Sequence, residues 1–395
     1  MSTRSTLAYL RTETGSGLLP PIAALAAIVW ANTPWAAAYF GLVAAPVPVQ
    51  VGPFAQTMGL GAWITTALMP VLFFVLGLEL KHEVLRGELS NPRRLALPVL
   101  AAAGGIALPA AIYVAANLGP GGAPHAWLAA APTDIAFALA ILALAGPRLP
   151  PTLRMFLLTI ALIDGAATGV GVALFYAEGL RFPMLAAAAA TLAVLAAMSR
   201  WRAAPYAFWA FGGVLLWAFT LKSGLSPALA GLALAAVFPL EPKRPGGVGV
   251  LQETMDALHP YVAFVVLPLF VFLAAGFPLS GGEDRDLIAP VSVGLAAALA
   301  LGKPLGIFGV AALVIGLKWA RRPTGARWIE LLGVSALCGV GFALSLFAGA
   351  VAFPPGDMRE DQMRAGVVVG SALAGALGLG LLGFSAARRA REAQG

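Results

Sequence analysis

Long apolar runs follow one another along the chain, separated by short stretches of charged residues, proline or glycine. About 20 apolar residues are enough to cross the hydrocarbon core of a bilayer as a helix. The pattern predicts an all-α membrane protein with about twelve transmembrane helices, and the longest run is long enough to be tilted or broken. The predicted spans are 17–31, 60–79, 95–117, 125–146, 155–177, 183–199, 204–220, 223–240, 256–276, 288–316, 328–352 and 365–386.

The runs form one transmembrane domain, 17–386, between a polar N-terminal segment, 1–16, and a short tail, 387–395. The segment 32–59 is long for a loop and is rich in valine and proline. It is compatible with a short β-hairpin and with a structureless proline loop, and the sequence leaves both open.

Composition and loop charges agree with this reading. Hydrophobic residues make up 60% of the 395-residue chain and charged residues only 11%, too few to cover a water-soluble globule, so the lipid bilayer is its solvent. Of the 25 Lys and Arg residues, 19 fall in loops on the side of the N-terminus and five on the other side. The positive-inside rule then places both termini in the cytoplasm. No basic block is interleaved with aromatic residues, so nothing points to nucleic acid.

Three ionisable side chains fall near the middle of predicted spans: Asp134, Asp164 and Lys303. A charge at the centre of a bilayer costs about 2.5–3.5 kcal/mol on insertion scales, so such residues persist where they pair, face water or carry something. A structural ion pair that fixes helix packing explains them, and so does a cation or proton path. The presence of three such residues in one chain favours a cation or proton path.

Pro132 precedes Asp134 in Ala-Pro-Thr-Asp, and it should break the span 125–146 because it lacks a backbone donor. A break in lipid is tolerated where protein or a water-filled cavity satisfies the freed groups. The hydroxyl of Thr133 could bind a small cation or cap the second half-helix. The alternative is a plain proline kink capped by Thr133 and Asp134.

Gly339 and Gly341 mark a second candidate break, in the span 328–352. Two interrupted spans at corresponding places in two repeats are typical of a transporter binding site. The three-helix units 95–177 and 288–386 fit such an inverted repeat. The alternative is that these glycines serve only helix packing.

Several motifs follow one another in order from about residue 10 to 386. The strongest segments are Gly77–Lys81, Thr133–Leu139, Val172–Tyr176, Leu221–Gly224, His259–Pro260, Leu267–Phe270, Gly302–Gly306 and Leu337–Phe342. In these motifs the chain resembles the NhaA family of bacterial sodium/proton antiporters. The resemblance implies twelve helices, two of them discontinuous and crossed, and exchange of Na+ or Li+ for H+ across the bacterial inner membrane in pH and sodium homeostasis.

The resemblance also implies roles for single residues. Asp164 is similar to the first of the family's two adjacent aspartates, and Lys303 to the lysine that pairs with it. Glu79 and Glu83 are similar to acidic residues linked to the pH response, although a solvated helix end explains them as well. A homodimer through the segment 45–56 is implied by resemblance only.

The chain departs from the family pattern at Gly165, which stands where the second aspartate, the main cation ligand, is expected. Other departures are Thr65, Thr66, Ser226, Met255 and Ala274. The departures gather at ion-handling positions. We therefore expect either weaker exchange with fewer protons per cycle, or a degenerate homologue that moves another solute or has a regulatory role.

The remaining oxygens define a candidate site for transient Na+ at Asp164, Asp134 and Thr133, with Thr168 one turn after Asp164. No cofactor motif is present, and neither a Ser/His pairing nor a His-Glu-x-x-His motif points to an enzyme. A channel is a further alternative, but a buried Asp/Lys pair suits coupled exchange better than open conduction.

Overall fold

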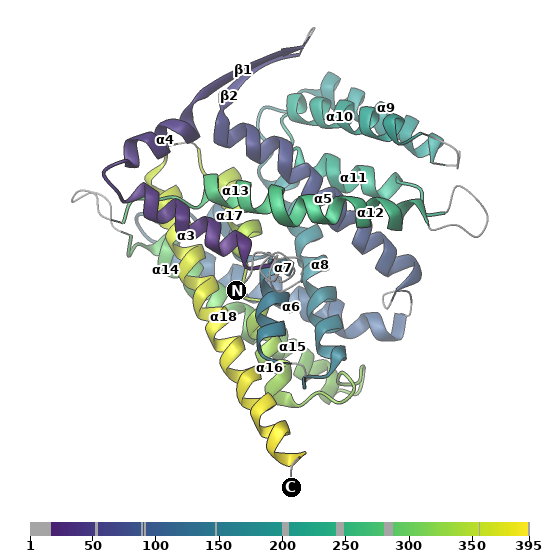
Figure 1. Ribbon diagram of the computed structural model, residues 1–395, viewed down its shortest axis with the longest axis vertical. Coiled ribbons are helices and arrows are strands. Elements are labelled where there is room, and N and C mark those ends of the chain that lie inside the picture. Colours follow the sequence, from purple (N-terminus) through teal and green to yellow (C-terminus); the bar gives the residue numbers. More distant parts are fainter. Residues whose placement is uncertain are drawn as a thin grey trace, which may run out of the picture. The chain divides into compact units, whose positions relative to one another are not determined.

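The computed structural model describes residues 17–51, 54–87, 90, 92–146, 148–199, 205–241, 249–279, 287–354 and 356–393. The predicted segment 1–16 and the last two residues of the tail lie outside these ranges. The described chain is mainly helical, and every predicted span coincides with one helix or with consecutive helices (Figure 1). The prediction of an all-α membrane fold is confirmed.

The helices are α3 (Leu19–Ala31), α4 (Ala36–Ala44), α5 (Leu60–Arg86), α6 (Pro92–Ala116), η2 (Pro124–Ala130), α7 (Ile135–Leu144), α8 (Pro151–Phe175), α9 (Phe182–Met198), α10 (Tyr206–Ser223), α11 (Ala228–Val237), α12 (Val250–Tyr261), η3 (Val262–Val266), α13 (Leu267–Ala274), α14 (Pro290–Ala297), η4 (Ala298–Gly302), α15 (Lys303–Gly316), α16 (Trp328–Leu337), α17 (Phe342–Ala352) and α18 (Met358–Glu392). The strands are β1 (Pro46–Val51) and β2 (Phe54–Gly59).

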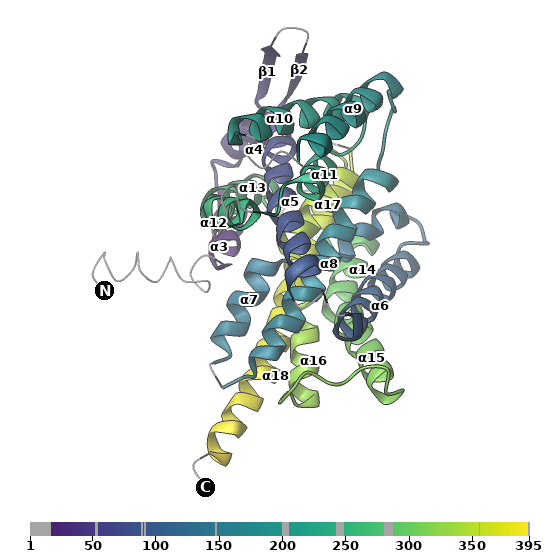
Figure 2. The same cartoon turned by 90° about the vertical axis from the view of Figure 1, so that its right-hand side faces the viewer.

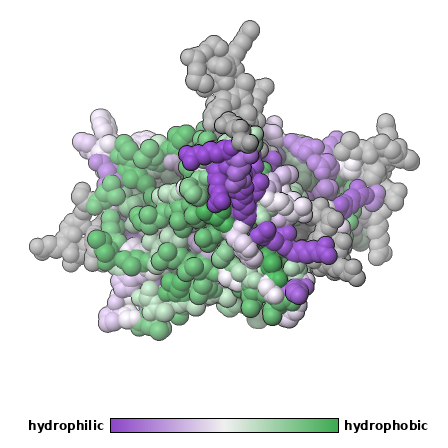
Figure 3. Space-filling model, turned by 90° about the horizontal axis from the view of Figure 1, so that it is seen from below, coloured by the Kyte–Doolittle hydropathy of each residue, from purple (hydrophilic) through white to green (hydrophobic). Residues whose placement is uncertain are grey.

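Within the described ranges, six helices are long and apolar enough to cross a bilayer, and three bent helix pairs raise the number to nine if each pair is one span. The shorter α9, α10 and α11 occupy the other predicted spans. Many large apolar side chains are exposed, including Leu25, Leu174, Phe211 and Leu373. Apolar side chains also form much of the face in Figure 3. Such a surface suits lipid and would be unfavourable in water.

One compact unit contains 1–33, 91–165 and 274–395, and so holds α3, α6, η2, α7, the first part of α8 and all helices from α14 to α18. The long α18 packs along α14 and α16 (Figures 1 and 2). The helices α6 and α15 approach closely at Gly104 and Gly306, where a Cβ on either glycine would meet the carbonyl oxygen of the other. Glycine is required at such a crossing because any side chain would separate the backbones.

The second unit contains 34–90 and 166–273, and so holds α4, the two strands, α5, the end of α8 and the helices from α9 to α13. Here α5 packs against α11, and α10 against α9 and α11. Its core includes the buried side chains of Phe74, Leu78, Trp209, Phe238 and Leu251.

The segment 46–59 forms an antiparallel hairpin in the second unit, with Pro46 opposite Gly59 and Val51 opposite Phe54. Of the two alternatives left open by the sequence, the hairpin is therefore correct. The indole nitrogen of Trp63 donates to the carbonyl of Val47 at 2.8 Å, which ties β1 to α5. Figures 1 and 2 show the hairpin projecting beyond α4 and α5.

Two long spans contain a π-helical turn that the sequence analysis did not predict: η3 before α13, and η4 between α14 and α15. Each turn is followed by a proline, Pro268 and Pro304. A proline cannot donate to the carbonyl four residues before it, and a π turn accommodates the missing bond without ending the helix. The span 288–316 is thus continuous from Pro290 to Gly316 with a local bulge.

Candidate functional site

The first predicted break is present. The helix η2 ends at Ala130, α7 begins at Ile135, and the two are bent by 46°. Asp134 is the N-cap of α7, and its Oδ1 accepts a hydrogen bond from the backbone N–H of Phe137 at 3.2 Å. The cap is therefore the aspartate and not Thr133, whose hydroxyl is directed elsewhere.

The second predicted break is also present. The helix α16 ends at Leu337, α17 begins at Phe342, and the bend between them is 42°. A Cβ on Gly339 would collide with the carbonyl of Leu299, and one on Gly341 would collide with the hydroxyl of Ser345. Both glycines thus leave room for neighbouring polar groups, in addition to making the helix easier to interrupt.

The two breaks cross and satisfy each other's backbone groups. The N–H of Asp134 donates to the carbonyl of Val340 at 2.7 Å, and Asp134 Oδ2 accepts from the N–H of Ala343 at 3.1 Å. The hydroxyl of Thr133 is 2.8 Å from the carbonyl of Cys338. Asp134 therefore lies between the N-terminal ends of α7 and α17, where a negative charge is favoured. Broken helices in lipid need such partners.

An ion pair lies at this crossing. Lys303 Nζ is 2.6 Å from Asp164 Oδ2, and both side chains are completely buried. Lys303 also donates to Thr133 Oγ1 at 2.6 Å, and Thr133 Oγ1 is 3.1 Å from Asp164 Oδ2. The hydroxyl carries one hydrogen, so it accepts from the lysine and donates to either the carboxylate or the Cys338 carbonyl.

The π turn positions the lysine. Lys303 is the first residue of α15 and directly follows η4, Ala298–Gly302. Single π turns inside α-helices occur often at functional sites because they redirect the side chains that follow. The sequence did carry a signal for this turn, since Pro304 removes a donor from the helix next to Lys303.

The structure brings together most of the predicted site residues. Thr133, Asp134, Asp164 and Lys303 meet within one unit, around the breaks at Pro132, Gly339 and Gly341. Thr168 lies one turn after Asp164 on α8 and is fully buried. Sequence reasoning missed the carbonyl of Cys338, because nothing in the sequence identifies which backbone oxygen a broken helix will offer.

Glu79 and Glu83 belong to the other unit. They are one turn apart on α5, in the second unit, and both are half-buried. Between them in sequence, Lys81 donates to the carbonyls of Ala236 at 2.8 Å and Phe238 at 2.6 Å. A lysine at the last carbonyls of α11 is favoured by the negative end of that helix.

Comparison with known proteins decides the family. The family model described as "Na+/H+ antiporter 1" matches residues 7–382. The chain belongs to the NhaA family. It is 42% identical to the Na(+)/H(+) antiporter NhaA of Pseudomonas putida strain GB-1, over 94% of this chain and 95% of that protein. It is also 42% identical to NhaA 2 of Pseudomonas savastanoi pv. phaseolicola, over 96% and 95%, and to NhaA of Nitrobacter hamburgensis, over 94% and 89%.

The chain departs from the NhaA family pattern at Gly165, which directly follows Asp164 of the ion pair. Gly165 is buried on α8, directly after Asp164. It contributes no side chain, so Asp164 is the carboxylate that contacts Lys303. The charged groups of the crossing are consequently Asp164, Lys303 and Asp134, and the last is already hydrogen-bonded to two helix ends.

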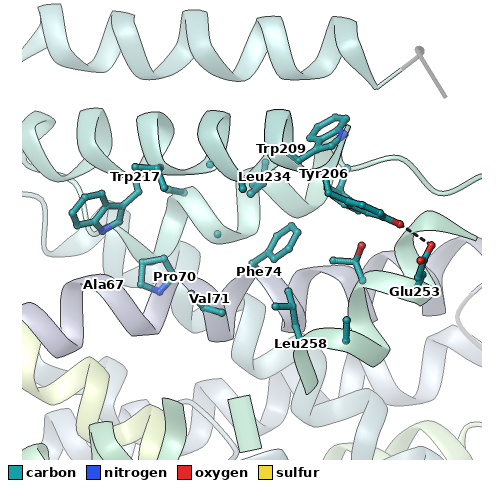
Figure 4. A pocket seen from close by; sticks show the side chains of 18 residues that line it. Ala67, Pro70, Val71, Phe74, Tyr206, Trp209, Trp217, Leu234, Glu253 and Leu258 are labelled. Carbon is teal, nitrogen blue, oxygen red and sulfur yellow. Dashed lines mark hydrogen bonds between the residues drawn. The ribbon is translucent and has the colours of Figure 1, made fainter. Parts of the chain in front are cut away.

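A separate cavity of about 660 Å³ lies in the second unit, between α5, α10, α11 and α12. Figure 4 shows its walls, formed largely by Phe74, Trp217, Leu234 and other apolar side chains, with a hydrogen bond from Tyr206 to Glu253 at one end. None of the predicted ion-handling residues lines it. The cavity therefore does not change the assignment of the site.

Proposed function

We propose that this chain exchanges Na+ or Li+ for H+ across the bacterial cytoplasmic membrane, and so serves pH and sodium homeostasis. The single observation that carries the proposal is the buried Asp164–Lys303 pair at the crossing of two broken helices. Its relatives in Pseudomonas and Nitrobacter are named Na+/H+ antiporters, which agrees with transport rather than enzyme chemistry.

Competition between Na+ and the Lys303 ammonium for the Asp164 carboxylate explains how sodium transport is coupled to proton transport. Two buried charges are tolerated together because each compensates the other, and removing one partner leaves an uncompensated charge. A sodium ion that binds Asp164 takes the place of the Lys303 ammonium as its counter-charge. The lysine is then more stable as the neutral amine and releases its proton. Protonation of Lys303 on the other side of the membrane reverses these steps and expels the cation.

Charge balance then sets the stoichiometry. With the proton bound, the site holds Asp164 as carboxylate and Lys303 as ammonium. With sodium bound, it holds Asp164 as carboxylate, Na+ and a neutral lysine. Both states have the same net charge, so one Na+ exchanges for one H+ and the cycle moves no net charge. A second carboxylate at position 165 would alter this balance by carrying a further proton that sodium displaces.

Oxygen ligands near Asp164 suit a small hard cation. Thr133 Oγ1 lies within 3.1 Å of the Asp164 carboxylate, and Thr168 follows one turn later on α8. Asp134 adds negative charge to the crossing while it holds the ends of α7 and α17. We assign Asp164 and Thr133 as direct ligands, Asp134 and Thr168 as further candidates, and the broken helices as the element that changes between the two access states.

The pH response is assigned to Glu79 and Glu83. Like charges one helical turn apart repel, and neutralisation of Glu79 relieves the repulsion. The state of this pair therefore depends on pH. Replacement of Glu79 by glutamine removes one of the two charges and should flatten the dependence of transport rate on pH.

Orientation and assembly complete the proposal. Both termini face the cytoplasm, as the loop charges require. A second copy of the chain pairs through the segment 45–56, which lies largely in the hairpin formed by β1 and β2. The alternative of a degenerate homologue with another solute or a regulatory role is favoured by no observation.

Transport in proteoliposomes tests the proposal. The purified chain is reconstituted with a pH-sensitive dye inside, an imposed pH gradient is established, and NaCl, LiCl or KCl is added. We expect Na+ and Li+, but not K+, to change the internal pH between about pH 6 and 9. The matched control, Asp164→Asn, should give no response. An equal response from the natural chain and this variant, or none from either, would rule the proposal out.

A further inference from the structure

A serine hydroxyl at the second break has no partner. Ser345 lies in the first turn of α17, is fully buried, and its Oγ makes no hydrogen bond to any residue that the structure describes. Ser335, in the other half of the same broken span, is equally buried, but its Oγ donates to the carbonyl of Leu331 at 2.8 Å. Two serines in similar surroundings thus differ in whether the hydroxyl is satisfied.

The unpartnered hydroxyl is directed into the break. A Cβ built on Gly341 would collide with Ser345 Oγ and would stand 3.0 Å from the carbonyl oxygen of Pro132 and 3.2 Å from a methyl of Leu299. The Pro132 carbonyl is the second polar atom at this place, and no described residue donates a hydrogen bond to it. The first break and the second break therefore each place one oxygen beside Gly341.

A buried hydroxyl without a partner is unfavourable, most of all in a membrane where no bulk water can replace the lost bond. A serine in a helix can donate its hydroxyl to the carbonyl four residues earlier, as Ser335 near the end of α16 does to Leu331. Polar groups of this kind are often explained by a bound water, ion or ligand. Because Ser345 lies beside two interrupted helices, we favour a transiently bound ligand over a permanent one.

Electrostatics at this place suits a cation. The ligand atoms are neutral oxygens, and unwound carbonyls and half-helix C-terminal ends are known to coordinate small cations in transporters. The N-terminal end of α17, which would repel a cation, is compensated by the Asp134 carboxylate on the N–H of Ala343. The next residue after Pro132 is Thr133, whose hydroxyl contacts Asp164. Pro132 is therefore the sequence neighbour of a residue that contacts the ion pair.

We propose that Ser345 Oγ and the Pro132 carbonyl form a second oxygen station for the translocated alkali cation, entered before or after the cation pairs with Asp164. The station rests on the proposed exchange function and adds a ligand to it. It has no carboxylate, so it binds weakly and with the cation partly hydrated. Its effect is to raise the local cation concentration at the crossing without taking part in proton exchange.

Affinity measurements on two matched variants test the station. Ser345→Ala removes the free hydroxyl, and Ser335→Ala removes a satisfied one at the same burial. In proteoliposomes we expect Ser345→Ala to raise the KM for Na+ and Li+ about five- to tenfold, with kcat within about twofold of the natural chain. Ser335→Ala should leave both constants unchanged.

Calorimetric titration of NaCl into the detergent-solubilised chain gives a readout without transport. The apparent Kd should rise about five- to tenfold in Ser345→Ala and in Ser345→Cys, which keeps the branching of the side chain but replaces the oxygen by sulfur, while the thermal unfolding midpoint reports whether each variant is folded. If the folded Ser345→Ala variant has the same KM and Kd as the natural chain, Ser345 binds no more than a structural water, and the proposed station is wrong. Absence of exchange by the natural chain would instead overturn the proposed function, while the titration would still decide the station.

Discussion

At the scale of single residues, Lys303 and Asp164 depend on each other. Their atoms are 2.6 Å apart with no exposed surface on either side chain. Removing one of two buried partners typically destabilises a protein by about 3–5 kcal/mol, whereas removing both costs less. The pair therefore contributes to stability as well as to exchange, and the two contributions can be separated by measurement.

A double-mutant cycle makes this separation. We expect Lys303→Met and Asp164→Asn each to lower the free energy of unfolding in mixed micelles by about 3 kcal/mol, because each leaves an unpaired polar or charged group in the crossing. The double variant should lose clearly less than the sum of the two. Strict additivity would show that the two side chains do not interact in the folded protein.

Gly165 is the residue that sets the charge of the site. We expect Gly165→Asp to lower the KM for Na+ by about tenfold, since a second carboxylate adds an anionic ligand beside Asp164. The exchange should also become sensitive to membrane potential if the second carboxylate is protonated in the proton-loaded state, because two protons, one from that carboxylate and one from Lys303, then leave for each Na+ that binds. Gly165→Asn, similar in size and uncharged, is the control. Potential-independent exchange by the aspartate variant would contradict the extra exchanged proton, and potential-dependent exchange by the natural chain would refute the charge balance proposed above.

At the scale of elements, the sequence predicted the helices and both breaks, because Pro132 and the glycines at 339 and 341 act through local backbone chemistry. It did not predict the π turn before Lys303, because a proline inside a helix is compatible with a kink, a bulge or an end. It also did not predict α4, a helix of nine residues in the segment between the first two predicted spans. Contacts across the crossing depend on which carbonyls face which side chains, and a single sequence does not contain that information.

The close crossing of α6 and α15 offers a test at the same scale. We expect Gly306→Ala to lower the free energy of unfolding by about 1–3 kcal/mol, because the added methyl group meets the carbonyl of Gly104. Gly309 lies on the same helix with nothing within 4 Å of an added Cβ, so Gly309→Ala should change stability by less than about 0.5 kcal/mol. Similar effects of the two substitutions would mean that the helices do not cross at Gly306.

At the scale of the whole molecule, the distribution of basic residues predicts that both termini are cytoplasmic. Single cysteines test this with a membrane-impermeant maleimide on intact cells. We expect Gly119→Cys, in an exposed loop between α6 and η2, to be labelled from outside. Arg321→Cys, exposed between α15 and α16, should be labelled only after the cells are opened, and the natural chain not at all because Cys338 is buried. The reverse pattern would invert the proposed topology.

The central claim is that a sodium ion displaces a proton from the Asp164–Lys303 pair. Its most direct measurement is the number of protons released when Na+ binds to the purified chain, obtained from calorimetric titrations in buffers of different ionisation enthalpy. We predict about one proton per bound sodium, and no proton release from Lys303→Met. Sodium binding with no proton release from the natural chain would contradict the claim.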